Sequence, residues 1–304
     1  MKSRLLYAAL GALALTTPVT AQTNPTVYGS VVFGHEWEDM EAPPYGLYSM
    51  PADNGNAIKL EVRNDAIKAN GGGVYIDGMY HLVDFTRYEF EQVVTFRTFD
   101  TKNNWKLINE QTIKSYSSAA SDLTYDPVGD KIYGCFKETA TSTQYFLGTL
   151  NPITGFASKI ADIDEELIVL ASTRDGKLYG VGAYGMLYSV DKQTGKLTKI
   201  GQTGKSVKYS QSATFDYASG RMLWAMTPHY TNESPELCEI DLSTGKTTTL
   251  ATIPERYEFT GIYTLSPYEA DNAAQTVTAF GREGCAQRNG QLHGTYRYDG
   301  RKHA

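Results

Sequence analysis

The sequence is short of the residues that mark several common classes of protein. It has only 3 cysteines, no C-x-x-C pair and 5 scattered histidines, so no metal-ligand spacing is present. Lysine and arginine are not clustered, and the formal net charge of −6 argues against nucleic acid as a partner. No later segment is apolar over the roughly 20 residues that span a bilayer. We therefore expect no cofactor, no bound metal and no membrane span in the mature chain.

Common catalytic motifs are also missing. The chain has no G-x-S-x-G, no H-E-x-x-H and no phosphate-binding glycine loop. Cys135 and Cys238 fall in strand-like segments of different repeats, while Cys285 lies near the C-terminus. We interpret the first two as small buried hydrophobic residues, with a disulfide between them as the alternative.

The N-terminus has the pattern of an export signal. Two basic residues precede an apolar run over residues 5–15, and small residues at 19–21 fit a cleavage site. The run has about half the length of a membrane anchor, which is the alternative. We expect residues 1–21 to be a signal peptide and the mature protein to be periplasmic, on the cell surface or secreted.

A repeated hairpin is the main signal in what remains. The clearest copies cover residues 187–200 and 237–250, where a D-x-x-T-G-K turn joins two alternating segments. Weaker copies cover residues 47–60, 96–107 and 146–160. Their turn positions are Gly55, Asn104, Gly155, Gly195 and Gly245. Asp or Asn bonds nearby backbone amides, and Gly or Asn accepts a positive φ, so each copy predicts a β-hairpin.

Each of these hairpins follows another hairpin-like pattern. Residues 126–134, 174–180 and 217–224 share a polar turn followed by an aromatic residue, and residues 70–83 are similar. Four strands per repeat, at a period of about 40–50 residues, are typical of propeller blades. The sequence therefore predicts an all-β propeller over residues 22–266, with an open array of β-sandwiches as the alternative.

The number of blades follows from the ends of the repeat region. Residues 27–33 look like a second strand without a first, and residues 259–265 look like a first strand with nothing after it. Pairing them would complete a blade and remove the open edges of the ring. We expect five four-stranded blades closed by N- and C-terminal strands, or six if residues 34–45 hold extra strands.

The D-x-x-T-G-K hairpins and their upstream K-L-Y-G strands resemble the PQQ-like and YVTN-type propeller repeats of exported bacterial proteins. More narrowly, the chain resembles secreted propeller proteins of Bacteroidetes-type bacteria, in which fibronectin-like or adhesin modules often follow the propeller. Quinone-dependent members of the first group dock their blades with a Trp at the end of the second hairpin strand. In this chain the matching positions hold aliphatic residues, which argues against a quinone cofactor: Leu60, Leu107, Ile160, Ile200 and Leu250.

Two loops carry candidate ligand-binding residues. The first combines His35, Trp37 and Glu38 with further carboxylates, a mixture that suits a sugar or a cation, although it lacks the spacing of a Ca²⁺ loop. The second holds His229 and Tyr230 in an insertion between two strands of one blade. Plain solvated loops are the alternative for both.

Catalysis on polysaccharides is the competing functional hypothesis. The run 162–166 could supply paired carboxylates of the glycosidase kind. However, no carboxylate lies in the expected innermost strands, at residues 74–76, 123–125, 168–172, 212–215 and 259–263. We therefore favour an exported, non-catalytic binding or adhesion module for a glycan or surface protein. A polysaccharide hydrolase or lyase acting at the central channel is the alternative.

Residues 267–304 are expected to be a linker and an unstructured tail. From Phe280 the chain becomes rich in Arg, Gly and His, and the alternation stops. A frameshifted or truncated start of a further β-module would explain the change, and a disordered polar terminus is the alternative. In either case we expect no packing on the propeller.

Overall fold

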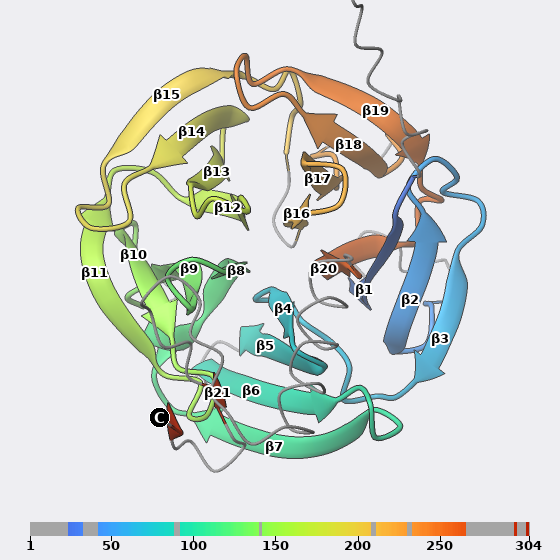
Figure 1. Cartoon of the computed structure of the whole chain (residues 1–304), viewed down its shortest axis with the longest axis vertical. Coiled ribbons are helices and arrows are strands. Elements are labelled where there is room, and N and C mark those ends of the chain that lie inside the picture. Colours follow the sequence, from blue (N-terminus) through green and yellow to red (C-terminus); the bar gives the residue numbers. More distant parts are fainter. Residues whose placement is uncertain are drawn as a thin grey trace, which may run out of the picture.

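Five four-stranded antiparallel sheets stand around a central axis as the blades of a closed β-propeller (Figure 1). This computed structural model describes residues 24–32, 42–87, 92–139, 142–207, 211–229, 233–265, 295–296 and 302–303. The prediction of an all-β propeller is confirmed, and its blades number five within these residues.

The strands of each blade run in order from the axis outward. Blade 1 contains β20 (Glu258–Thr264), β1 (Thr26–Val32), β2 (Gly46–Pro51) and β3 (Lys59–Arg63). Blade 2 contains β4 (Gly73–Ile76), β5 (Met79–Arg87), β6 (Gln92–Asp100) and β7 (Lys106–Ile113). Blade 3 follows a 3-10 helix, η2 (Tyr116–Ser118), and contains β8 (Ala120–Asp126), β9 (Lys131–Lys137), β10 (Tyr145–Leu150) and β11 (Ala157–Ile163).

The remaining two blades are each built from four consecutive strands. Blade 4 contains β12 (Leu167–Ser172), β13 (Leu178–Gly182), β14 (Met186–Val190) and β15 (Leu197–Gln202). Blade 5 contains β16 (Ser212–Asp216), β17 (Arg221–Met226), β18 (Glu236–Ile240) and β19 (Thr247–Thr252). Two short strands, β21 (Thr295–Tyr296) and β22 (Lys302–His303), pair only with each other.

The ring closes in blade 1, as the sequence predicted. Strand β1 pairs with β20 in antiparallel register, with Val27 opposite Thr264 and Val32 opposite Glu258. The other edge of β1 pairs with β2. A strand from each end of the propeller region therefore completes one blade, and the edges of β1 and β20 that face each other are paired.

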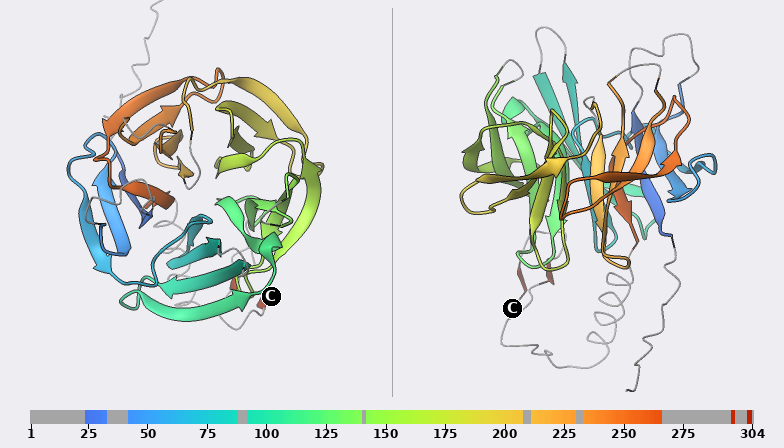
Figure 2. Two further views of the ribbon diagram at one scale, coloured as in Figure 1. Left: turned by 180° about the vertical axis from the view of Figure 1, so that it is seen from behind. Right: turned by 90° about the horizontal axis from the view of Figure 1, so that it is seen from above.

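The two faces of the disc carry different connections (Figure 2). One face, which we call the turn face, carries the turns of both hairpins in blades 2 to 5 and of the β2–β3 hairpin in blade 1, including residues 173–177, 217–220 and 241–246. The opposite face, which we call the loop face, carries the connections between hairpins and between blades. Strand β1 begins, and β20 ends, at the turn face.

The hydrophobic core is divided among the seams between neighbouring blades. Five clusters of buried side chains are present in the described residues, one at each seam. For example, Phe96 of blade 2 and Phe136 of blade 3 share a cluster, and so do Val181 of blade 4 and Trp224 of blade 5. Packing of apolar residues between blades, not within one blade, therefore holds the ring together.

The turn glycines are required by the close approach of the preceding blade. Gly245 has a φ of 80°, and a Cβ there would lie 2.5 Å from the backbone oxygen of Gly201 in blade 4. The expected positive φ is confirmed at the other turn positions except Gly55. At Gly55 the constraint is only the close approach, because a Cβ would lie 2.0 Å from the oxygen of Thr252 in blade 5.

The cysteines within the described residues behave as predicted. Cys135 and Cys238 are free and fully buried, and burial raises the pKa of each thiol to about 12. Both therefore remain protonated and unreactive at neutral pH. Cys285 lies outside the described residues. Among the described residues no helix is long and apolar enough to cross a membrane.

Candidate functional site

A single carboxylate occupies the middle of the central channel. Asp122 lies in β8 and is fully buried. Its Oδ2 accepts hydrogen bonds from the backbone N–H of Leu170 at 3.1 Å and of Ala213 at 3.0 Å, which belong to the innermost strands of blades 4 and 5. Its Oδ1 accepts a bond from the Ser212 hydroxyl at 2.9 Å. One side chain thus joins three blades at the axis.

Ser212 extends this network to a fourth blade. Its Oγ accepts a hydrogen bond from the backbone N–H of Ile262 in β20 at 3.1 Å. Burial raises the pKa of Asp122 to about 8, against the opposing effect of the hydrogen bonds donated to its carboxylate. A group so enclosed and so fully bonded positions the blades and is not placed to meet a ligand.

The expectation that the innermost strands contain no carboxylate is wrong. These strands are longer than the sequence predicted, so that β8 includes Asp122 and Asp126, β16 ends at Asp216 and β20 begins at Glu258. All four are buried. Asp126 binds Lys192 of blade 4 at 2.5 Å, and Asp216 accepts a hydrogen bond from the Thr264 hydroxyl of blade 1 at 3.0 Å. Asp126 and Asp216, at the ends of their strands, thus each join two neighbouring blades.

A small cavity lies on the turn-face side of Asp122, among the innermost strands. The cavity measures about 40 Å³ and is lined mainly by residues of the innermost strands, among them Tyr75, Tyr125 and Tyr263. Tyr75 and Tyr263 stack with ring centroids 4.7 Å apart. Ligand pockets usually measure roughly 300–1,000 Å³, so this cavity has room for a few water molecules at most.

Tyr217 lies across the channel at the turn face. Its hydroxyl lies 3.3 Å from the carbonyl oxygen of Tyr125 and 3.2 Å from that of Ser172, and it donates towards both. A residue of blade 5 thereby spans the strand ends of blades 3 and 4. Tyr217 and Phe215 line the channel cavity and also a second hollow on the outside.

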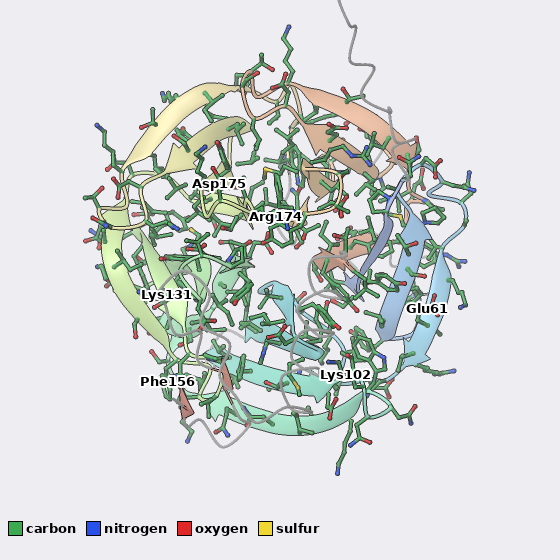
Figure 3. The ribbon with its side chains drawn as sticks, viewed as in Figure 1. Glu61, Lys102, Lys131, Phe156, Arg174 and Asp175 are labelled. Carbon is green, nitrogen blue, oxygen red and sulfur yellow. The ribbon has the colours of Figure 1, made fainter. Side chains whose placement is uncertain are left out.

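That second hollow is a shallow cleft of about 460 Å³ on the turn face, between blades 4 and 5. We call it the turn-face cleft. Its apolar lining comes from Tyr179, Phe215, Tyr217 and Leu242. The polar lining comes from the β12–β13 turn, namely Thr173, Arg174, Asp175 and Lys177. Figure 3 shows Arg174 near the centre of the ring and Asp175 farther from it.

The β12–β13 turn is held in shape by its own side chains. Asp175 accepts hydrogen bonds from the Thr173 hydroxyl at 2.5 Å and from Lys177 Nζ at 2.8 Å. The bond from Lys177 lowers the pKa of Asp175, and the same pair raises the pKa of Lys177, so both stay charged at neutral pH. Gly176 has a φ of 76°, which allows the tight reversal.

The sequence-predicted ligand-binding residues belong to the loop face or lie outside the described residues. His35, Trp37, Glu38 and Tyr230 lie outside them. His229 follows β17 at the end opposite the turn-face cleft, is exposed, and donates its backbone N–H to the Ser206 oxygen at 3.3 Å. The acidic run 162–166 is also at the loop face, where Glu165 accepts a bond from Tyr188 and Glu166 from Ser121.

Sequence reasoning missed the turn-face cleft because its residues are distant in sequence and have ordinary local explanations. Arg174 and Asp175 were part of a turn pattern, and Phe215 was assigned to a strand. One signal in the sequence could have indicated the cleft: in neighbouring repeats an aromatic residue lies next to the inner hairpin turn, at Tyr179 and at Tyr217. Within the described residues, no group of three or more His, Cys, Asp or Glu side chains could hold a metal ion.

These features define the protein as a five-bladed β-propeller with a small cavity among its innermost strands and an open, aromatic-lined cleft on one face. No protein-family model matches the sequence, and neither does any curated protein. Solved structures of other propeller proteins are similar in fold. They include a putative 6-phosphogluconolactonase from Bacteroides fragilis, with 12% identity, a TM-score of 0.41 and coverage of 82% of this chain and 100% of that chain.

Two further solved structures are similar to this chain at the same level. An auxiliary nutrient binding protein from Bacteroides ovatus has 11% identity and a TM-score of 0.39, over 76% of this chain and 49% of that chain. An α-L-arabinofuranosidase from Podospora anserina, in complex with cellotriose, has 12% identity and a TM-score of 0.41, over 64% and 72%. At this level of similarity none of these proteins indicates what the present chain binds or does.

Proposed function

We propose that this protein is an exported, non-catalytic module that binds a glycan in the turn-face cleft. The observation that carries the proposal is the cleft itself, where Tyr179, Phe215 and Tyr217 lie beside charged and hydroxyl groups of one rigid turn. Aromatic faces pack against the apolar faces of sugar rings, and the adjacent polar groups bind hydroxyls. A volume of about 460 Å³ is in the range of ligand sites.

The state of the carboxylates in the innermost strands supports binding over catalysis. The carboxylates of the innermost strands are buried, and Asp122, Asp126 and Asp216 are bonded to other blades. A glycosidase needs two carboxyl groups that flank the scissile bond of an enclosed sugar. The channel cavity of about 40 Å³ does not offer that space. A hydrolase or lyase at the channel remains the alternative, and the binding experiment below also tests it.

The test begins with a glycan array probed with the mature chain, followed by calorimetry with the best oligosaccharide. Tyr179→Ala should weaken binding about tenfold or more, because loss of a central aromatic contact costs about 1–2 kcal/mol or more. Tyr179→Phe should retain most of the affinity. The matched control is Tyr184→Ala, since Tyr184 is 83% exposed in the β13–β14 turn on the loop face.

The outcomes separate the competing hypotheses. Full binding by Tyr179→Ala, with loss of binding in His35→Ala, Trp37→Ala, Glu38→Ala, His229→Ala or Tyr230→Ala, would move the site to the loop face. Shortening of the bound oligosaccharide during the assay would support the enzyme hypothesis. Absence of binding to any glycan would contradict the proposal and would direct the search to protein partners.

A further inference from the structure

The turn-face cleft lies where the preceding seam carries an ion pair, and the difference points to its ligand; this inference rests on the function proposed above. At the seam between blades 3 and 4, Lys192 Nζ binds the Asp126 carboxylate at 2.5 Å and lies 5.8 Å from the ring centroid of Tyr133. Asp126 is fully buried and Tyr133 is 5% exposed. The ion pair therefore covers the tyrosine at the turn face of this seam.

At the seam between blades 4 and 5, two uncharged residues hold the corresponding positions. Leu242 follows the first Asp of its outer turn, as Lys192 does in blade 4. Thr173 corresponds to Asp126, because each comes two residues after the strand partner of the first tyrosine in the next strand. The Thr173 hydroxyl donates to Asp175 of its own turn. The ion pair is thus replaced at this seam, and both replacing residues line the turn-face cleft.

The tyrosine at this seam is correspondingly more accessible. Tyr179 holds the same position in β13 as Tyr133 holds in β9, since the two pair with equivalent residues of the innermost strands. Tyr133 is buried, whereas Tyr179 is partly exposed and lines the cleft together with Leu242. The space that the Lys192 side chain fills at one seam therefore belongs to the cleft at the next.

A ligand in that space meets an aromatic ring and an aliphatic side chain, where the preceding seam has a lysine and a carboxylate. Tyr179 and Leu242 favour contact with an apolar surface. A pyranose offers such a surface when its hydroxyls are equatorial, because its ring hydrogens then cover both faces, whereas an axial hydroxyl would be buried without a hydrogen bond. We propose that the turn-face cleft binds glycans of equatorially substituted pyranoses, and that one sugar ring packs on Tyr179 and Leu242.

Glycans that differ in the direction of one hydroxyl test the class of ligand. Cello-oligosaccharides have only equatorial ring substituents. Manno-oligosaccharides of the same length and the same β-linkage differ from them only in an axial hydroxyl at the second carbon of each ring. In calorimetry the mature chain should bind the cello-oligosaccharide about tenfold more tightly or better, because the axial hydroxyl would lose its water without gaining a partner.

Variants that rebuild the ion pair test the position of the sugar. Thr173→Asp combined with Leu242→Lys gives this seam the residues that close the preceding one, and it should weaken binding about tenfold or more. Leu242→Lys alone, which leaves the β12–β13 turn unchanged, should also weaken binding. The matched control is the reverse exchange at the preceding seam, Asp126→Thr combined with Lys192→Leu, which should leave the affinity unchanged. Thermal unfolding of each variant confirms that the ring is intact.

The failure of this inference differs from failure of the proposed function. If both variants that carry Leu242→Lys keep full affinity, the position of the sugar is wrong, and if the cello- and manno-oligosaccharides bind equally, its class is wrong. In either case glycan binding stands. Loss of binding in the intact variant with Asp126→Thr and Lys192→Leu would show a general effect on the ring and would also overturn the position. Binding to no glycan at all overturns both proposals.

Discussion

At the scale of single residues, the axis of the ring holds a chemically unusual group. Asp122 has no basic partner among its bonded neighbours, and its donors are backbone amides and a hydroxyl. A second enclosed titratable group, His81, lies at the seam between blades 2 and 3, stacked on Phe96 and bonded to the Thr98 hydroxyl at 3.0 Å. Burial lowers the pKa of His81 to about 4.

These two groups make opposite contributions to the pH dependence of stability. Asp122 has a folded pKa of about 8, above the ordinary 3.8, so its contribution is present at low pH and is lost as pH rises through 8. His81 has a folded pKa below the ordinary 6.5, so its contribution is present above 6.5 and is lost as pH falls towards 4. Between pH 4 and 6.5 the two slopes oppose each other.

We therefore expect Asp122 to lower the free energy of unfolding between pH 6.5 and 8, where the opposing effect of His81 has ended. A range of 1.5 pH units corresponds to about 2 kcal/mol for one proton. The measurement is denaturant unfolding at several pH values for the native chain and for Asp122→Asn. The variant will be less stable throughout, so the difference in slope is the readout. Parallel curves for both proteins would contradict the assignment.

At the scale of elements, the outer hairpin is the unit that the sequence described best. The two strands of the hairpin, its turn and its five occurrences along the chain were all predictable. The reason is that the Asp and Gly of the turn, and the alternation of apolar and polar residues, act locally. One shared feature was not. In every blade the pairing of the third and fourth strands shifts by one residue, as between Leu187 and Tyr188 of blade 4.

This shift explains an error in aligning the repeats. In blades 3, 4 and 5 the extra residue is the aliphatic position assigned from sequence: Ile160, Ile200 and Leu250. In blades 1 and 2 it is Glu61 and Ile108, one residue later than the assigned Leu60 and Leu107. A strict period of two cannot reveal a bulge, because a bulge reverses the alternation at the position where it occurs.

The close contact between neighbouring hairpins makes a prediction at this scale. Gly245→Ala should destabilise the protein by about 2–4 kcal/mol, from the strained φ and from the clash of its Cβ with Gly201. Gly204→Ala is the matched control, since Gly204 has a φ of 76° but nothing within 4 Å of its Cβ position. It should cost only about 1 kcal/mol. Equal losses in thermal unfolding would show that the blades do not meet at this turn.

At the scale of the whole molecule, the sequence predicted the ring but not the turn-face cleft. The ring follows from repetition, and the pairing of residues 27–33 with 259–265 follows from two half-blades that complete each other. The turn-face cleft depends on how blades 4 and 5 pack against each other, because this packing brings Tyr179, Phe215 and Arg174 together. No local pattern encodes that arrangement, since each residue also has an ordinary role in its own strand or turn.

Ring closure makes the last prediction. Removing residues 22–34 deletes β1, which leaves the facing edges of β20 and β2 unpaired and empties the positions of the fully buried Val27 and of Val31. Because every seam packs one blade on the next, an opened ring should lose its single cooperative unfolding transition and self-associate through the exposed edges. Calorimetry and light scattering measure the two effects. A chain without residues 266–304 is the control, since it keeps all twenty strands of the ring.

A peptide supplied in trans makes this test specific. Residues 24–33 as a synthetic peptide should insert between β20 and β2, because both edges offer unpaired backbone groups in a fixed register. The peptide should restore the cooperative transition and reduce self-association, whereas a peptide of the same composition in scrambled order should not, since its valines would no longer match the buried positions. If the shortened chain unfolds as cooperatively as the native one without any peptide, the prediction is wrong. The seam between blades 5 and 1 would then not depend on β1, and β1 would serve only to cover the edges of β20 and β2.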